Sequence, residues 1–232
     1  MKNSSEEILI HPYTAIRLFA RTYLSIGDTI FTDRKYKVTR EAWITAMFLL
    51  GLKNHSGEEW FFKPEIKSGS PDFYCYTFIH NKKIGGSERP EIKLEVFEYR
   101  KEDNEGDFLE ALKKIKLNKI VDPNLTLVCY IRRNQVVPPA VELNQKLKEI
   151  NPKVKDIWYL GDVTPDAKTW RIIQLYPNTL AIDLDYDEVL STKEQHSFIH
   201  PYRGRADKFE YEHTGKQVLL TPEFEIKIVE KT

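Results

Sequence analysis

A run of seven mostly apolar residues, Leu125 to Ile131, is the most informative stretch for the fold. Such a run is typical of a strand that is buried on both faces of a sheet. Helical signals lie on either side of it: residues 106–120 carry apolar side chains at helical spacing, and Pro138-Pro139 begins a helix that extends to Ile150. A buried strand between two helices predicts an α/β protein.

The segment before this run predicts three strands joined by turns. Ser68-Gly69-Ser70-Pro71 is typical of a turn, and residues 81–90 are expected to form a basic hairpin loop. The chain from residue 39 to 160 is therefore predicted to run helix, three strands, helix, strand, helix, strand. The elements not yet named are a helix from Thr39 (as N-cap) to Gly51, strands at Trp60–Ile66, Asp72–Ile79 and Glu91–Lys101, and a strand at Asp156–Leu160.

The two ends of the chain add helices and strands to this core. A first helix is expected from Pro12 to near Gly27, after a loose start and before a small strand within residues 28–38. Later strands are expected at Trp170–Leu175 and Thr179–Leu184, with a hairpin at Gln217–Glu230. We expect residues 1–165 to form the α/β core with its N-terminal helices, and residues 166–232 to form a β-rich C-terminal extension packed on the same domain.

The charge balance limits how the chain can attract a partner. Its 232 residues include 35 Lys or Arg and 35 Asp or Glu, so the formal net charge is zero. A neutral chain has no whole-molecule attraction for nucleic acid, and a polyanion must be held by a local basic patch.

The distribution of apolar residues and cysteines predicts a cytoplasmic protein without a membrane segment. No apolar run approaches the ~18 residues needed to span a bilayer, and the N-terminus lacks the pattern of a signal peptide. The two cysteines, Cys75 and Cys129, each lie in an apolar, strand-like run. We therefore expect reduced thiols in the core rather than a disulfide.

Three acidic residues stand at or inside the second and third predicted strands, where acids are rare. Asp72 begins one strand, and Glu95 and Glu98 lie inside the next. Because side chains alternate along a strand, Lys93 shares a face with Glu95, whereas Arg100 shares a face with Glu98. Carboxylates from adjacent strands suit Mg²⁺ or Mn²⁺, and a bound ion of this kind can activate water for phosphodiester hydrolysis.

At this point the chain resembles the PD-(D/E)XK superfamily of restriction-endonuclease-like nucleases. The resemblance rests on Pro71-Asp72, on Glu95-Val96-Phe97, and on the predicted order of helices and strands over residues 39–160. It implies a restriction-endonuclease-like αβββαβ core with a mixed central sheet. It also implies that Asp72 and Glu95 bind Mg²⁺ and that a further acidic residue assists these two. The implied activity is hydrolysis of phosphodiester bonds in DNA. The candidates for that acid are Glu41, Glu58 and Glu59.

The chain departs from this family at one position. The family has a lysine two residues after the strand acid, and here that residue is Phe97. One hypothesis is an active enzyme whose lysine comes from elsewhere, with Lys93 on the face of Glu95, or Lys113 or Lys114 from the next helix, as the candidates.

Two further hypotheses remain open. The pair Glu98 and Arg100 restores an acid and a cation at the right spacing, although arginine stays protonated and serves only to stabilise phosphate charge. Alternatively, the fold is catalytically inactive and acts as a nucleic-acid- or protein-binding module in a larger assembly. In the most ordinary interpretation, Asp72 is a turn acid and the strand charges form pairs on a solvated face.

Two basic segments are the candidate contacts for DNA, because arginine and lysine suit phosphate groups. The residues concerned are Lys82, Lys83 and Arg89 in the hairpin loop, and Arg203 and Arg205 near the C-terminus. If the protein is instead a module of a larger assembly, its partner would be another protein or a second copy of the chain.

Two other motifs are weaker. The acidic run from Asp183 to Glu188 has the spacing of a Ca²⁺ loop, but it has Glu188 where such a loop needs glycine, and an acidic strand edge explains it better. His196 and His200 are four residues apart, as in some zinc sites, but no third ligand accompanies them.

Overall fold

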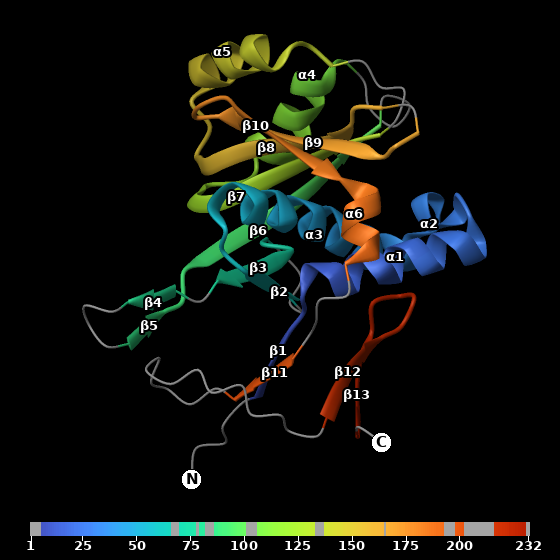
Figure 1. Ribbon diagram of the computed structural model, residues 1–232. Helices are drawn as coiled ribbons and strands as arrows, with labels where there is room; N and C mark the ends of the chain where they lie inside the picture. The colour runs from blue at the N-terminus through green and yellow to red at the C-terminus, as the bar shows by residue number, and fades with distance from the viewer. Residues whose placement is uncertain are drawn as a thin grey trace. The chain divides into compact units, whose positions relative to one another are not determined.

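A computed structural model describes residues 6–65, 70–77, 79–81, 86–100, 106–132, 137–164, 166–192, 198–201 and 216–230. The protein is an α/β protein with N-terminal helices, a seven-stranded mixed and strongly curled sheet, and a small C-terminal hairpin (Figure 1). The chain divides into two compact units, which we describe separately. The first comprises Met1–Pro64, Cys75–Glu91 and Thr192–Thr232, and the second comprises Glu65–Tyr74 and Ile92–Ser191.

The large sheet has the strand order β10-β9-β8-β7-β6-β3-β2. Its strands are β2 (Trp60–Pro64), β3 (Phe73–Thr77), β6 (Glu91–Tyr99), β7 (Asp122–Ile131), β8 (Val154–Asp162), β9 (Thr169–Tyr176) and β10 (Leu180–Asp185). Strand β7 pairs in parallel with both β6 and β8, whereas β8, β9 and β10 pair antiparallel in turn. The sheet is therefore mixed, and its parallel strands lie in its middle.

One large buried cluster of the second unit lies on one face of this sheet. The helices among the described residues of this unit are α4 (Phe108–Leu112), which continues directly into a π-helical turn, η3 (Lys113–Leu117); α5 (Ala140–Ile150); and α6 (Tyr186–Ser191). Alternate residues of β6 and β7, such as Phe97 and Leu127, pack against α4 and α5 in one buried cluster. Asp107 and Glu110 form a capping box that starts α4. This cap and cluster place η3 beside β6.

The first unit contains the N-terminal helices, two short hairpins and a two-stranded ribbon. Besides β2, its elements are β1 (Glu6–Leu9), α1 (Pro12–Ile26), α2 (Thr29–Thr32), the 3₁₀ turn Arg34–Tyr36, α3 (Lys37–Ser56), β4 (Ile79–Asn81), β5 (Gly86–Glu88), β11 (Phe198–Pro201), β12 (Lys216–Leu220) and β13 (Ile226–Glu230). The middle of α3 is buried on all sides, and α1 packs along it with Phe19 stacked on Trp43. Strand β1 pairs antiparallel with β11.

The predicted order from residue 39 to 160 is confirmed as α3, β2, β3, β6, α4, β7, α5 and β8, with the hairpin β4–β5 inserted before β6. The first helix, from Pro12 to the residue before Gly27, and the C-terminal hairpin are also confirmed. The strands predicted near residues 170 and 180 form β9 and β10 of the large sheet.

Two predictions near the N-terminus are wrong. Residues 28–38 form a short helix and a 3₁₀ turn instead of a strand, because Arg40 of α3 donates hydrogen bonds to the carbonyl oxygens of Ile30 (2.7 Å) and Asp33 (3.1 Å). Thr39 is not the N-cap of α3, which begins two residues earlier. Its hydroxyl instead donates to the carbonyl of Pro222 at 2.6 Å.

Two further boundaries differ from the expectation. The start of the chain is not wholly loose, since residues 6–9 form β1. Asp122-Pro123-Asn124 ends the preceding helical segment as predicted but also begins β7. In the part of the chain that the structure describes, no helix combines the length and hydrophobicity needed to cross a membrane.

Candidate functional site

Glu95 lies in the middle of β6 on the face that α4 covers. It pairs in register with Leu127 of β7, and its face also carries Phe97 and Tyr99. Only 10% of the Glu95 side chain is exposed. The Glu95 carboxylate thus lies among the large apolar side chains of Leu127, Phe97 and Tyr99. A carboxylate in such surroundings needs a compensating partner.

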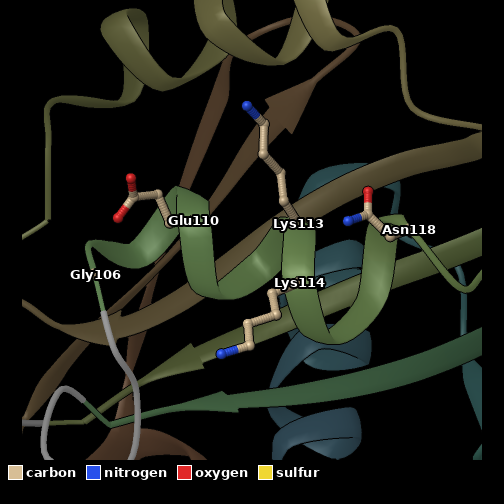
Figure 2. A pocket seen from close by; sticks show the side chains of 5 residues that line it. All are labelled: Gly106, Glu110, Lys113, Lys114 and Asn118. Atoms are coloured by element: carbon tan, nitrogen blue, oxygen red, sulfur yellow. The ribbon is translucent and has the colours of Figure 1, made fainter.

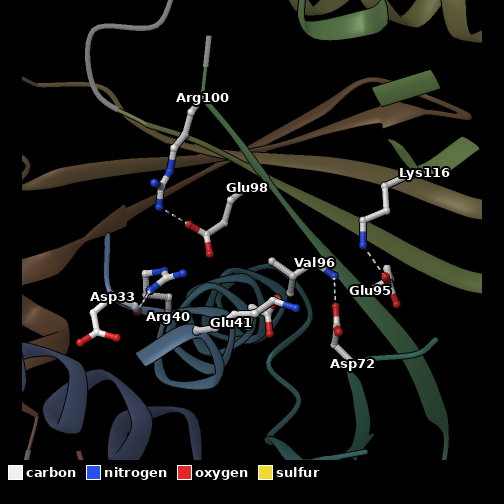
Figure 3. A network of polar contacts seen from close by, with 10 residues as sticks. Asp33, Arg40, Glu41, Asp72, Glu95, Val96, Glu98, Arg100 and Lys116 are labelled. Atoms are coloured by element: carbon white, nitrogen blue, oxygen red, sulfur yellow. Dashed lines mark hydrogen bonds and ion pairs between the residues drawn. The ribbon is translucent and has the colours of Figure 1, made fainter. Parts of the chain in front are cut away.

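The partner of Glu95 is Lys116. The Lys116 ammonium donates to Oε1 of Glu95 in a short ion pair, and the lysine side chain is itself 17% exposed (Figure 3). Lys116 lies in the π-helical turn η3, which continues α4. The ion pair therefore joins this helical segment to the strand β6.

Asp72 lies beside the same stretch of β6, directly before β3. Its backbone amide donates to the carbonyl of Leu94 at 2.9 Å, and its Oδ2 accepts from the backbone amide of Val96 at 2.8 Å (Figure 3). Asp72 thus makes two hydrogen bonds to the backbone of β6, one through its own backbone amide and one through its side chain. The Val96 nitrogen is bonded to the carbonyl carbon of Glu95, so the Asp72 carboxylate lies against the backbone of Glu95.

The second oxygen of Glu95 is in a different situation from the first. Oε2 is buried and has no hydrogen-bond partner among the described residues. An unpartnered buried carboxylate oxygen costs free energy. A cation bound at Oε2 would remove that cost, so this oxygen is a candidate metal ligand.

Lys93 does not pair with Glu95, although both lie on one face of β6. Its ammonium lies 3.0 Å from Oδ2 of Asp122, at the start of β7. A hydrogen bond from the backbone amide of Asn124, together with the Lys93 ammonium, lowers the pKa of Asp122. Lys93 thus joins the first residues of two parallel strands, and its predicted contact with phosphate stays a prediction.

Glu98 and Arg100 lie on the opposite face of β6. Nη2 of Arg100 is 3.4 Å from Oε2 of Glu98 (Figure 3). The structure therefore pairs this predicted acid and cation with one another, on the face that Glu95 does not share. Their catalytic role also stays a prediction.

Phe97 occupies the position at which the resembled family has lysine. It is 3% exposed, and its ring lies 6.5 Å from the rings of both Tyr99 and Phe108, measured between centroids. The position is therefore filled by core packing between β6 and α4. A lysine there would have to bury its ammonium among aromatic rings.

The acids predicted to assist belong to the first unit. Glu41 pairs with Lys37 at 3.2 Å within α3. Oε1 of Glu59 lies 3.5 Å from Nε2 of His11 and 2.8 Å from the ammonium of Lys53, and these contacts lower the pKa of Glu59 to about 2. Glu58 precedes it in the same connection. A role for any of the three as a further ligand stays a prediction.

Two other lysines of the helical segment, Lys113 and Lys114, line an open pocket together with Gly106, Glu110 and Asn118. Figure 2 shows the two lysine side chains pointing away from one another. The ion pair with Glu95 is made instead by Lys116, which the sequence interpretation did not single out as the substitute lysine. A signal was present: Lys116 follows the buried Phe108 and Leu112 at a spacing of four residues.

Most of the predicted DNA contacts lie outside the described residues: Lys82, Lys83, Arg203 and Arg205, as does His196. Arg89 is described, and its guanidinium lies 3.7 Å from the centroid of the Tyr76 ring, a cation–π contact. In the acidic run, Asp183 forms a bidentate pair with Arg171 of β9 (2.6 and 2.8 Å) on the edge strand β10. This arrangement agrees with an acidic strand edge.

Within the described ranges, no group of three or more His, Cys, Asp or Glu side chains is arranged to hold a metal ion. The candidate site is defined instead by the contacts described above. It consists of two carboxylates, Asp72 and Glu95, and one ammonium, Lys116. Comparison of the chain with models of protein families, with curated proteins and with solved structures found no match.

Proposed function

We propose that this protein is a metal-dependent nuclease that hydrolyses phosphodiester bonds in DNA. The observation that carries the proposal is the ion pair of Lys116 with Glu95, next to the strand at which Asp72 is anchored. Two acids and a lysine are the residue types that the PD-(D/E)XK resemblance requires. In this proposal the lysine missing at residue 97 is supplied by Lys116.

The topology supports the same proposal. The order α3, β2, β3, β6, α4, β7 corresponds to the helix, three strands, helix and strand of the αβββαβ core that the resemblance implies. The strands β2, β3, β6 and β7 are consecutive neighbours in the sheet, and β6 pairs in parallel with β7. The candidate acids lie at the junction of β3 and β6, in the middle of this core.

The donor set suits Mg²⁺ or Mn²⁺, because it offers carboxylate oxygens, and one of them, Oε2 of Glu95, is buried without a hydrogen-bond partner in the part of the chain that the structure describes. Asp72 and Glu95 would hold the ion, which would supply an activated water and neutralise phosphate charge. Asp72 is oriented by the Val96 amide, and Glu95 orients the Lys116 ammonium. Lys116 would stabilise the negative charge that develops on the phosphoryl oxygens in the transition state.

A second candidate function is a catalytically inactive binding module with the same fold. It is favoured by the absence, within the described ranges, of any group of three or more His, Cys, Asp or Glu side chains arranged to hold a metal ion. It is also favoured by the internal contacts that Asp72 and Lys116 already make. In such a module the ion pair would only stabilise the fold. The two functions differ in whether loss of the Asp72 carboxylate affects chemistry or merely folding.

The test is a nuclease assay on single- and double-stranded DNA with Mg²⁺ or Mn²⁺. We expect cleavage by the wild type, and a loss of at least about 100-fold in the variants Asp72→Asn, Glu95→Gln and Lys116→Met. Lys113→Met is the matched control, because it removes a neighbouring lysine of the same segment and should keep wild-type activity. Equal cleavage by the wild type and Asp72→Asn would reject the proposed site. DNA binding without cleavage at any metal concentration would support the binding module.

A further inference from the structure

We propose that three lysines at one edge of the large sheet hold the phosphate backbone of DNA. These residues, which we call the lysine edge, are Lys119, Lys153 and Lys155. The inference rests on the proposed function for the identity of the polyanion. It adds a binding surface in the second unit, separate from the basic segments in which the sequence placed the DNA contacts.

The topology of the sheet brings the three lysines together. Strands β7 and β8 are parallel neighbours, so both begin at the same edge. Asp122, the first residue of β7, is in register with Val154, which stands between Lys153 and Lys155. Lys119 precedes β7 by three residues. Because neighbouring strands lie about 4.8 Å apart, the three ammonium groups can reach successive phosphates of one DNA strand.

The lysine edge carries positive charge that the described acids do not neutralise. All three side chains are exposed, and none forms an ion pair with a described residue. Other lysines of the same unit are paired: Lys93 with Asp122 at 3.0 Å, Lys146 with Glu142 at 2.7 Å, and Lys168 with Asp187 at 3.1 Å. The edge is therefore a local basic patch.

The two acids that stand beside these lysines in the sequence or the sheet have other partners. The Asp122 carboxylate pairs with Lys93. Asp156, which follows Lys155, is partly buried and accepts a hydrogen bond from Thr126. A patch that keeps its positive charge is what a chain of zero net charge needs in order to attract a polyanion.

The lysine edge also lies close to the candidate site. Lys119 follows Lys116 by three residues, which is about 4.5 Å along a helix axis. Lys93, which contacts the first residue of β7, is two residues from Glu95 in β6. A DNA backbone held on the edge would therefore pass beside the ion pair of Glu95 and Lys116.

A purely structural role for these lysines predicts a different result. Lys119 stands at the end of a helical segment, where a cation stabilises the helix through its dipole. If this were its only role, substitution would lower the stability of the fold and leave binding of DNA unchanged.

The experiment measures binding of the full chain to a short fluorescein-labelled DNA duplex by fluorescence anisotropy. EDTA is present, so binding is measured without metal-dependent cleavage, and NaCl is varied from about 50 to 200 mM. The variant Lys153→Gln/Lys155→Gln is compared with the control Lys146→Gln/Lys168→Gln, which loses the same charge from lysines that are already paired. Circular dichroism and thermal melting establish that each variant is folded.

We expect the plot of log affinity against log salt concentration to become shallower by about 1.8 in Lys153→Gln/Lys155→Gln, because two phosphate contacts are lost. Affinity at the lowest salt concentration should fall at least about tenfold. Adding Lys119→Gln should reduce the slope by a further ~0.9, whereas the control should keep the wild-type slope.

The inference would be overturned by equal slopes for the variant and the control, or by a wild type that does not bind the duplex. Binding to vesicles of phosphatidylserine and phosphatidylcholine that the variant loses, with DNA binding unchanged, would also overturn it and assign the edge to a lipid surface. The proposed function is tested separately. Binding with the expected slopes but no cleavage with Mg²⁺ or Mn²⁺ would leave the lysine edge standing and reject the nuclease. Cleavage of DNA with an unchanged slope in Lys153→Gln/Lys155→Gln would do the reverse.

Discussion

The Glu95 carboxylate and the Lys116 ammonium form an ion pair across 21 residues of chain, between β6 and the helical segment that follows it. Both side chains are largely withdrawn from solvent. A pair of this kind is stabilising relative to either partner alone, because removal of one leaves a buried charge without compensation. The pair should therefore have a measurable signature in folding.

We expect Lys116→Met to lower the free energy of unfolding by about 2–3 kcal/mol, because it leaves Glu95 buried and unpaired. Adding Glu95→Gln should recover part of this loss, so that the double variant is less destabilised than the sum of the single variants. Urea denaturation measures all three. Lys113→Met should lie within about 0.5 kcal/mol of the wild type. Additive effects of the two substitutions would show that the residues do not interact.

Placing lysine at residue 97, where the resemblance would put one, should damage this protein. Phe97 packs against Phe108 and Tyr99 in the core, so Phe97→Lys should cost at least about 3–5 kcal/mol of stability. Phe97→Leu, which keeps an apolar side chain, should cost about 1–2 kcal/mol. Thermal or urea unfolding separates the two. A stable Phe97→Lys variant would contradict the packing described for β6 and α4.

The charge on Asp156, near the start of β8, should lower the free energy of unfolding at neutral pH. Burial raises the pKa of Asp156 above its ordinary value, against the hydrogen bond from Thr126. The folded state therefore disfavours the charged form, and stability falls as the pH rises through the folded pKa. We expect Asp156→Asn to be more stable than the wild type by on the order of 1 kcal/mol at pH 7, with no difference below the pKa of the unfolded chain.

The control for this prediction is Asp183→Asn. The bidentate contact with Arg171 lowers the pKa of Asp183, so its charge stabilises the folded state above the unfolded pKa. The variant should be slightly less stable at pH 7, by less than about 1 kcal/mol since the pair is on the surface. Melting temperatures at pH 7 and at pH 3 compare both variants. If both substitutions changed the stability at pH 7 in the same direction, the destabilising effect of burying Asp156 would be refuted.

The two cysteines should be inert in the folded protein. Cys75 and Cys129 are both unpaired and fully buried, and burial raises the pKa of each thiol. Because the thiolate is the reactive form, neither should react with a thiol reagent at pH 8 until the protein unfolds. Titration with the reagent should detect about two thiols in urea and almost none without it. Rapid reaction of the native protein would show that one of the two becomes exposed.

Local sequence signals predicted much of the fold. Pro12 and Gly27 bound the first helix because proline suits a helix start and glycine accepts the positive φ that follows a helix end. The apolar run at Leu125–Ile131 became the central strand β7, since such a run must be covered on both faces. Both signals act within a few residues and need no partner elsewhere in the chain.

Predictions that depended on distant contacts were the ones that went wrong. Residues 28–38 have no strong local preference, and their helical form depends on hydrogen bonds from Arg40. The N-cap assigned to Thr39 followed a local rule, yet its hydroxyl donates to Pro222, 183 residues later. Tertiary hydrogen bonds of this kind override weak local propensities.

The candidate site also depends partly on local sequence signals and partly on distant contacts. The sequence by itself placed Asp72 and Glu95 at two neighbouring strands and put Phe97 where the resemblance would expect a lysine. It did not determine which of several lysines meets Glu95, because side chains three or four residues apart compete for the same helix face. Only the tertiary structure decided this, by placing the helical segment beside β6 so that Lys116 reaches the carboxylate. The ion pair exists because a buried negative charge must be compensated by whichever cation the packing brings within reach.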